Sequence, residues 1–306
     1  MNLDQLLAEY RRYLGAERNF SQYTVRNYIT DVLDFLQFLK LAQKSLGEVD
    51  HLLIRSWLGQ LLERGIARGS ICRKLSALRS FFRYLTRERK LPHDPMSTVS
   101  GPKRERKLPS FLSPQEMQKL LEAPDTSTPQ GLRDKALLEL LYAAGLRVSE
   151  VVFLNVGHVD LKARQIRVWG KRSKERMVLI GRPAAEALEQ YLKFGRPKLL
   201  RRRSEALFLN RYGKRIAARR VQRLVREYAA RAGIERRVFP HMLRHTFATH
   251  MLDGGADLRA VQELLGHASL SSTQIYTHVT QIQMRRKYLQ AHPRSEESEP
   301  PEETSP

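Results

Sequence analysis

Apolar residues recur every three or four positions over most of this chain, which is the spacing of amphipathic helices. In the N-terminal part the pattern predicts four helices, with apolar stripes over residues 3–14, 25–39, 54–61 and 71–85. Ser21, Asp50 and Ser70 stand where the N-caps of the last three are expected, and Gly15 and Gly65 where the first and third end. The pattern predicts a helical N-terminal domain over residues 1–100.

A different pattern begins beyond residue 110. Ser113 and Glu116 form a capping box, with a proline at the first helical position between them, so a new helix is expected there. Two runs rich in β-branched residues, 165–169 and 176–180, predict strands on either side of a polar turn. Helical periodicity covers the stretches 132–144, 148–154, 183–194, 219–232, 240–253, 257–266 and 281–290. The expected fold class is therefore mostly α with a small β-sheet in the second domain.

Two further segments bound this second domain, which is expected over residues 111–294. Residues 101–110 include Lys103-Arg-Glu-Arg-Lys107 and are interpreted as a basic linker. Such a linker could pass along a DNA duplex or be an ordinary solvated hinge. Residues 295–306 contain Glu, Pro and Ser but no large apolar residue, which predicts a disordered acidic tail.

Charge narrows the class of partner. The 306 residues carry 54 Lys and Arg against 32 Asp and Glu, a formal net charge of +22, which favours nucleic acid over a membrane surface. No apolar run approaches the ~20 residues of a membrane span, and no signal peptide opens the chain, so a cytoplasmic protein with no membrane partner is expected. A single cysteine, Cys72, excludes an internal disulfide framework and a cysteine-based zinc site.

Candidate chemistry is concentrated in residues 239–279. His241 and Arg244 are three apart and share a face of a helix, whose first turn carries a proline and has amides free to meet an anion. His267 follows an expected helix end, and Tyr276 is a phenol able to act as a nucleophile in a cationic pocket. Two imidazoles, a guanidinium and a phenol suit a phosphodiester, whose displacement builds negative charge on its oxygens.

Simpler interpretations exist for each residue. Arg147 could cap the preceding helix or pair with Glu150, and Tyr276 alone would be an ordinary half-buried tyrosine. His241 and His245 have a spacing that can bind zinc, but no Glu follows His241 as in H-E-x-x-H. No Asp and Glu cluster resembles a metal cage, which argues against a two-metal nuclease. We therefore expect no metal and no cofactor. His245, His250 and His278 are expected to serve packing, or hydrogen bonds that support the site, rather than catalysis.

Several spaced motifs, taken together and in order, resemble the tyrosine recombinases, and most closely the bacterial XerC/XerD group. They are His241-x-x-Arg244, Leu264-Leu-Gly-His267 and Gln274-Ile-Tyr276-Thr-His278, preceded by Ala144-Gly-Leu-Arg147-Val-Ser-Glu150 and Gly170-Lys171. The resemblance runs from near the N-terminus to about residue 293. The spacing alone does not select Lys171 from Arg172 and Lys174, so its choice depends on the resemblance.

The resemblance implies an active site made of Arg147, Lys171, His241, Arg244, His267 and Tyr276. Tyr276 would form a 3′-phosphotyrosyl bond, the arginines and histidines would stabilise the phosphate, and Lys171 would protonate the leaving 5′-oxygen. It also implies a two-domain C-shaped clamp on double-stranded DNA at a specific site, without metal or ATP. Four protomers, identical or including a sister recombinase, would exchange C-terminal helices, expected at 281–290. Resolution of chromosome dimers before cell division, with a septal DNA translocase as activator, is the implied process.

Three alternatives remain open at the level of sequence. A type IB topoisomerase uses similar residues but would relax supercoils without a specific site. An integrase of a phage, transposon or integron shares the chemistry, although no additional N-terminal arm-binding domain is evident here. A non-catalytic DNA-binding protein would keep the charge but need none of the six residues.

Overall fold

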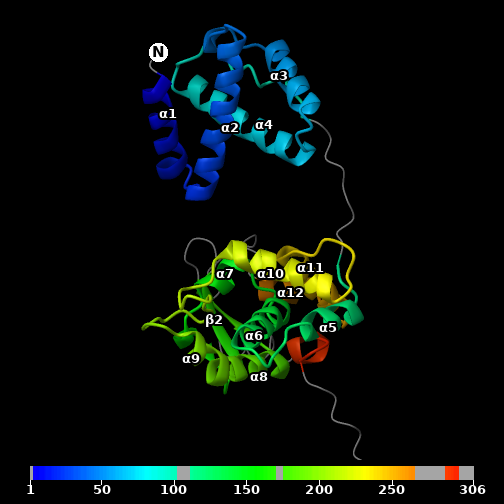
Figure 1. The fold of residues 1–306 in the computed structure, drawn as a ribbon. Helices are drawn as coiled ribbons and strands as arrows, with labels where there is room; N and C mark the ends of the chain where they lie inside the picture. The colour runs from blue at the N-terminus through cyan, green and yellow to red at the C-terminus, as the bar shows by residue number, and fades with distance from the viewer. Residues whose placement is uncertain (1–2, 102–110, 170–174, 266–286, 296–306) are drawn as a thin grey trace, which may run out of the picture. The chain divides into compact units, whose positions relative to one another are not determined.

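The chain folds as two compact units, residues 1–107 and 108–306, shown in Figure 1. The computed structural model describes residues 3–101, 111–169, 175–265 and 287–295. The expected basic linker lies almost entirely outside the described residues, as does the acidic tail beyond Ser295. In the part of the chain that is described, no helix combines the length and apolar character needed to cross a membrane.

The first unit is helical, and its caps explain where its helices begin. Ser21 accepts a hydrogen bond from the Thr24 amide, and Asp50 accepts one from the Leu53 amide, which confirms both predicted N-caps. The predicted cap at Ser70 is wrong. The last helix starts three residues earlier than predicted, with Ala67 at the N-cap position, because the chain is already extended at Ala67, and the Ser70 amide donates to the Ala67 carbonyl within the first turn. The elements are α1 (Leu3–Arg12), η1 (Tyr13–Glu17), α2 (Gln22–Leu41), η2 (Leu46–Glu48), α3 (His51–Glu63) and α4 (Arg68–Arg87).

Carboxylates on α2 hold two of the basic residues on α4. Asp31 is 1% exposed and pairs with Arg73, while Lys74 lies 2.7 Å from Asp34 and 3.4 Å from Asp31. Arg73 and Lys74 are adjacent basic residues of α4, and a chain whose charge favours nucleic acid could use such residues to contact phosphate groups. In the folded unit their charges instead help to join α2 to α4, because a buried carboxylate needs a paired cation.

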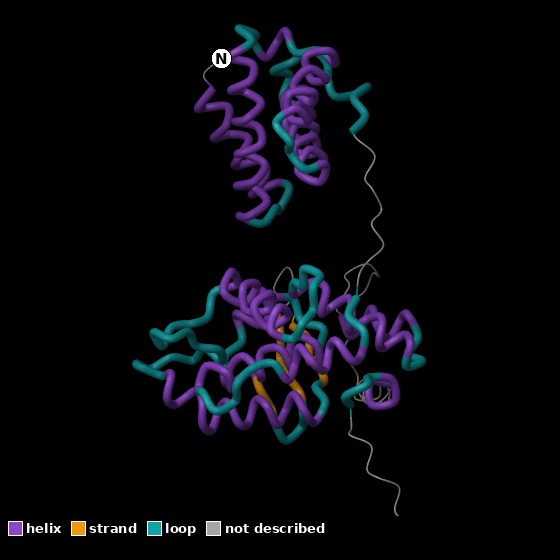
Figure 2. Tube along the Cα trace, turned by 45° about the vertical axis from the view of Figure 1, so that its right-hand side comes forward, coloured by secondary structure: helices purple, strands orange, loops and turns teal. Residues whose placement is uncertain are grey.

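The second unit is mostly helical with a small antiparallel sheet in the order β1-β2-β3, which lies among the helices (Figure 2). This confirms the predicted fold class, although η3, β1 and α9 were not predicted. Its elements are α5 (Pro114–Glu122), α6 (Pro129–Ala143), α7 (Val148–Phe153), η3 (Val156–His158), β1 (Val159–Asp160), β2 (Gln165–Trp169), β3 (Glu175–Leu179), α8 (Arg182–Gln190), η5 (Tyr191–Gly195), α9 (Arg196–Leu199), α10 (Ala218–Arg231), α11 (Pro240–Asp253) and α12 (Leu258–Leu265).

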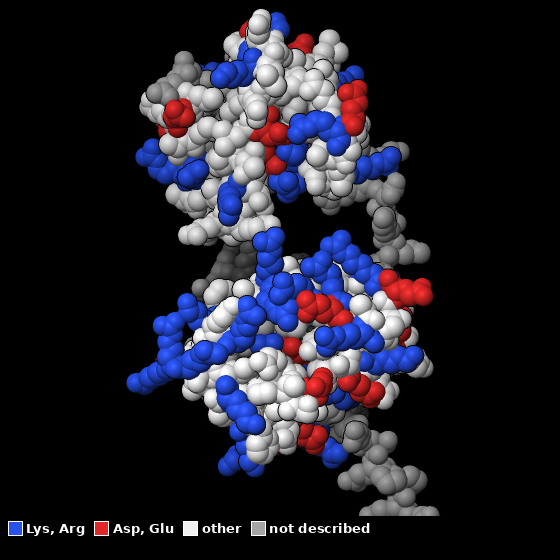
Figure 3. All heavy atoms as spheres, viewed as in Figure 1, with Lys and Arg blue, Asp and Glu red and all other residues white. Residues whose placement is uncertain are grey.

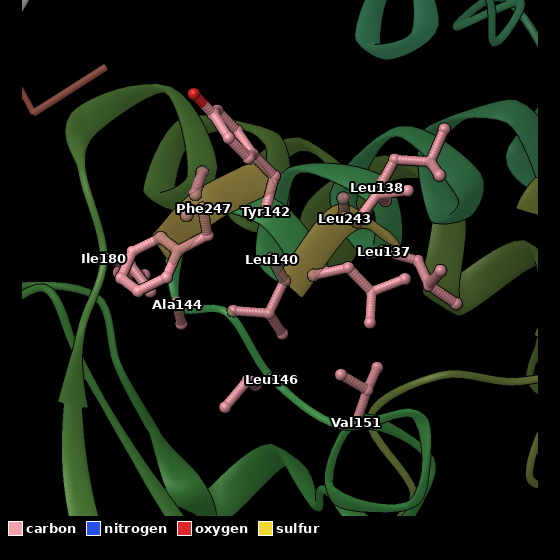
Figure 4. Close-up of a cluster of buried hydrophobic side chains, with 14 of the residues drawn as sticks. Leu137, Leu138, Leu140, Tyr142, Ala144, Leu146, Val151, Ile180, Leu243 and Phe247 are labelled. Atoms are coloured by element: carbon pink, nitrogen blue, oxygen red, sulfur yellow. The ribbon is translucent and has the colours of Figure 1, made fainter. Parts of the chain in front are cut away.

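Helix α6 is the central element of this unit. Every residue from Ala136 to Ala143 is buried, so the helix is enclosed on all sides rather than amphipathic. Figure 4 shows Leu137 and Leu140 of α6 near Leu243 of α11. A helix packed in this way has a fixed C-terminal end, and the chain leaves that end directly toward Arg147. The hydrophobic core therefore places the first candidate active-site residue.

Candidate active site

Arg244 joins the ends of two other helices to α11. Its side chain is 7% exposed, and it donates to the carbonyl of Gly145 at 2.5 Å and to the carbonyl of Leu265 at 2.7 Å. Gly145 follows α6 with a φ of +54°, and Leu265 is the last residue of α12. Carbonyl groups at helix ends have no partner within their own helix. The Leu265 carbonyl is such a group, and the Gly145 carbonyl lies just beyond α6. The two contacts together hold Arg244 in one orientation.

The charge of Arg244 is not neutralised by direct contact. Within the described ranges, no carboxylate forms an ion pair with it, and both observed partners are neutral carbonyl groups. Burial, followed by the positive charge of Arg147, lowers the pKa of Arg244 to about 10, while Glu150 acts in the opposite direction. The guanidinium still carries its proton at neutral pH. A buried and unneutralised cation creates a positive potential suited to an anion.

Arg147 stands at the N-terminus of α7 and pairs with Glu150 one turn later. The Glu150 carboxylate accepts from the Arg147 amide at 2.9 Å and from its Nη1 at 2.8 Å. The pairing that the sequence left open is thus present. Glu150 has a 3% exposed side chain, whereas that of Arg147 is 35% exposed. Burial favours a higher pKa for Glu150, but hydrogen bonds and charge from Arg176, and then from Arg147, outweigh it and lower the pKa.

Arg176 completes the cluster and was missed by the sequence analysis. Its Nη1 and Nη2 donate to the two oxygens of Glu150 at 3.0 and 3.1 Å, and the residue is 8% exposed. The signal was present in the strand pattern. In β3 Arg176 shares the buried face with Val178, while Met177 between them is exposed. An arginine at an inward strand position requires a buried acidic partner.

The predicted site residues are only partly described. His241 lies in the first turn of α11 and is exposed, although Arg244 on the same helix is buried. Lys171, His267 and Tyr276 lie outside the described residues. Of the six predicted residues, Arg147 and Arg244 are therefore brought into one charged cluster, together with Glu150 and Arg176.

His250, near the end of α11, is buried and has the packing role expected for it. Its Nδ1 lies 2.8 Å from the Tyr142 hydroxyl and its Nε2 lies 3.0 Å from the Leu112 carbonyl oxygen. These contacts attach the segment before α5 to α6 and α11. No group of His, Cys, Asp and Glu side chains suited to a metal ion occurs among the residues that the structure describes.

Comparison with known proteins places this chain in a family. The model described as "Phage integrase family" matches residues 110–282, and that of the "Phage integrase, N-terminal SAM-like domain" matches residues 7–89. The chain is 44% identical over 294 residues to "Tyrosine recombinase XerC" of Pelotomaculum thermopropionicum, covering 92% of this chain and 96% of the relative. It is 41% identical over 298 residues to "Tyrosine recombinase XerD" of Listeria innocua, covering 96% of this chain and 100% of the relative.

A solved structure supports the same assignment. The XerH site-specific recombinase bound to palindromic difH substrate, a post-cleavage complex, aligns with a TM-score of 0.70 at 25% identity. The alignment covers 92% of this chain and 84% of that chain. With family models over most of its length and relatives of this identity, the chain belongs to the phage integrase family and, within it, to the tyrosine recombinases. The family expected from the sequence motifs is confirmed.

Proposed function

We propose that this protein cuts and rejoins duplex DNA at a specific site through a 3′-phosphotyrosyl intermediate, and that it resolves chromosome dimers at cell division. Family membership supports the reaction class, and relatives named XerC and XerD support the process. Each cleavage would conserve its bond energy in the protein–DNA link, so that neither ATP nor a metal ion is needed. Acting on the chromosome would place the protein in the cytoplasm.

The proposed chemistry divides the steps among six residues. The Tyr276 phenol gives up its proton to solvent and attacks the phosphorus, and the bond to the 5′-oxygen breaks as the phosphotyrosyl bond forms. Lys171 gives a proton to the leaving oxygen, while Arg147, Arg244, His241 and His267 stabilise the charge that develops on the non-bridging oxygens. The 5′-hydroxyl of a partner duplex then attacks the phosphotyrosyl bond and releases Tyr276.

One observation carries the proposal: Arg244 is buried near Arg147, and none of the carboxylates that the structure describes pairs with it. Three arginines and one glutamate leave two net positive charges in this cluster. Maintaining such an excess in a buried place costs free energy, unless an anion compensates it. A phosphodiester that gains charge in its transition state is such an anion, and guanidinium groups match its oxygens in geometry.

A basic surface supports DNA as the partner. Between Arg196 and Arg226 the sequence has twelve Lys and Arg residues and one acidic residue, Glu205. Figure 3 shows Lys and Arg side chains gathered over α10 and near α9. We define the basic surface as six exposed residues that form no ion pair within the described part of the chain: Arg201, Arg202, Arg203, Arg211, Lys214 and Arg219. Phosphate groups along a duplex suit such a surface.

The assembly belongs to the same proposal. Four protomers, either identical or including a sister recombinase, would act on two sites, and a septal DNA translocase would activate them. Relatives carrying both the XerC and the XerD name occur at similar identity, so either role is compatible with this chain.

Covalent capture provides the test. The full chain is incubated in EDTA with nicked suicide duplexes that cover candidate chromosomal sites, and covalent complexes are resolved on denaturing gels. We expect one site to form a complex attached to a 3′-phosphate. A strict requirement for magnesium, or attachment to a 5′-phosphate, would contradict the mechanism. Relaxation of supercoils without any preferred site would instead identify a type IB topoisomerase.

A further inference from the structure

We propose that Arg176 is a positioning residue, which saturates the Glu150 carboxylate so that Arg147 keeps its donors for the scissile phosphate. The inference rests on the function proposed above and extends it to a residue outside the six predicted from the motifs. Arg176 comes from β3 and Glu150 from α7, so the contact joins the sheet to the helix that begins at Arg147.

The Glu150 carboxylate accepts four hydrogen bonds, all from Arg147 and Arg176. Its Oε1 accepts from Nη1 of Arg147 at 2.8 Å and from Nη1 of Arg176 at 3.0 Å. Its Oε2 accepts from the Arg147 amide at 2.9 Å and from Nη2 of Arg176 at 3.1 Å. A carboxylate offers about four lone-pair sites, so these contacts fill it. Arg147 contributes one guanidinium nitrogen to Glu150 and retains its other donors.

Removal of Arg176 would change the partner of Arg147. Glu150 would remain buried with vacant lone pairs, which is unfavourable. Arg147 is the neighbouring cation with room to move, because its side chain is 35% exposed. A two-point contact with the carboxylate would satisfy Glu150. The same contact would turn the Arg147 guanidinium away from a phosphate, and Arg176 prevents this by occupying the carboxylate first.

Stability alone does not explain Arg176. A buried ion pair loses hydration on both partners, and apolar replacements of similar volume are often no less stable. The Nε atom of Arg176 is also buried without a hydrogen-bond partner in the described structure, which adds a cost. A side chain with these costs fits a role in the charged site, where its contact controls a neighbouring arginine.

A double-mutant cycle tests the inference on the full chain. Arg176→Gln, Glu150→Gln and the combined variant are compared in single-turnover cleavage of the suicide duplex recovered by covalent capture. Arg176→Gln should slow cleavage about 10- to 100-fold, because misplaced catalytic groups cost rates of this order. DNA affinity should stay within about twofold, because Arg176 does not touch a surface phosphate in this proposal. In the Glu150→Gln background, Arg176→Gln should lower the cleavage rate less than about threefold, because Arg176 acts through Glu150.

The outcomes separate this inference from the proposed function. An equal loss from Arg176→Gln in both backgrounds, or no loss in the unaltered background, overturns the positioning role. Arg147→Gln serves as a reference. If Arg147→Gln cleaves as well as the unaltered chain, the role of Arg147 fails, and that of Arg176 fails with it. If Arg147→Gln abolishes cleavage while Arg176→Gln has no effect, only the inference fails. Arg176→Lys, which keeps the charge with fewer donors, replaces Arg176→Gln in the cycle if the latter does not fold.

Discussion

The charged cluster shows how single residues can serve both the fold and the site. Arg244 donates to the carbonyl of Gly145, just beyond α6, and to that of Leu265 in α12, and neither of these neutral partners balances its charge. Gly145 makes this geometry possible. Its φ of +54° suits glycine, and an added Cβ would lie 2.7 Å from Phe247 and 2.8 Å from Leu265. The approach of α11 and α12 to the end of α6 therefore depends on the absence of a side chain.

We predict that Gly145→Ala lowers the free energy of unfolding of the second unit by about 2–4 kcal/mol, since it adds backbone strain to overpacking. Gly233→Ala is the matched control. The φ of Gly233 is +70°, but no atom lies within 4 Å of the added Cβ. Gly233→Ala should therefore lower the free energy of unfolding by only about 1–2 kcal/mol. Urea denaturation, followed by the fluorescence of Trp169 in a Trp57→Phe background, measures both. Equal losses in the two variants would show that the packing around Gly145 can relax.

The proposed nucleophile gives a second prediction at this scale. Tyr276→Phe keeps the ring and removes the attacking oxygen, so covalent capture should disappear while DNA affinity stays within about twofold. Tyr23→Phe, which removes an exposed hydroxyl in the first unit, should leave capture intact. A protein–DNA adduct formed by Tyr276→Phe on denaturing gels would refute the assignment of Tyr276.

Among the elements, the last described segment, residues 287–295, is held against the second unit by several contacts. Tyr288 is 1% exposed and donates to the Ala143 carbonyl at 3.0 Å, and Arg294 pairs with Glu139 at 3.0 Å. Ser295, assigned from sequence to the acidic tail, is buried and donates to the Leu289 carbonyl. The described part of the segment expected to dock on a neighbouring protomer therefore packs on its own chain.

His292 makes the docking of this segment sensitive to acid. Its ring stacks on Tyr288, with centroids 5.0 Å apart, and burial, followed by the positive charge of His250 and Arg294, lowers its pKa to about 3. The unfolded chain has a histidine pKa of ~6.5, so between these values the unfolded state binds a proton that the folded state does not. Stability is therefore lost as the pH falls below ~6.5.

We expect the free energy of unfolding of the second unit to fall when the pH is lowered from about 7.5 to about 5.5. The fall should be up to ~1.4 kcal/mol larger in the unaltered protein than in the His292→Phe variant. His292→Phe keeps an aromatic ring against Tyr288 but does not titrate, while His250 remains in both proteins as a common background. The same urea titration at both pH values measures the difference. If the two proteins lose equal stability, His292 does not carry the acid sensitivity.

For the whole molecule, net charge governs the encounter with a partner. The excess of +22 is distributed unevenly, and the basic surface near α10 lacks neutralising carboxylates in the described chain. By contrast, Arg73 and Lys74 of the first unit are already paired with Asp31 and Asp34. Basic residues that look equivalent in the sequence should therefore contribute unequally to DNA binding.

We predict that replacing Arg201, Arg202 and Arg203 together with Gln reduces the slope of log affinity against log salt by about 2–3, because each lost phosphate contact removes about 0.9. Replacing Lys119, Lys162 and Lys193 with Gln is a control with the same loss of charge at exposed positions elsewhere in the unit. Gel-shift titrations at several salt concentrations measure both. Equal slopes for the two triple variants would mean that net charge alone, and not the basic surface, sets the affinity.

The local sequence pattern determined most of the helices and strands of this protein. Short-range bonding explains why the caps at Ser21 and Asp50 were predictable, since a cap bonds to an amide within the first turn. Runs of β-branched residues beside a polar turn predicted the strands β2 and β3, and apolar periodicity predicted the helix α11. Spaced motifs led to the family. Ser70 was misjudged because the backbone conformation before a helix, not residue type alone, decides where it starts.

Only the tertiary structure decided which charges meet. Arg176 and Glu150 are 26 residues apart, and Arg244 and Gly145 are 99 residues apart. No periodicity links such positions, since their distance depends on how α6, α7, α11 and the sheet pack together. For the same reason, the sequence could not distinguish Arg73, paired inside the first unit, from the exposed arginines near α10. Local bonding determines an element, whereas the partner of a buried charge is selected when the elements pack and exclude water.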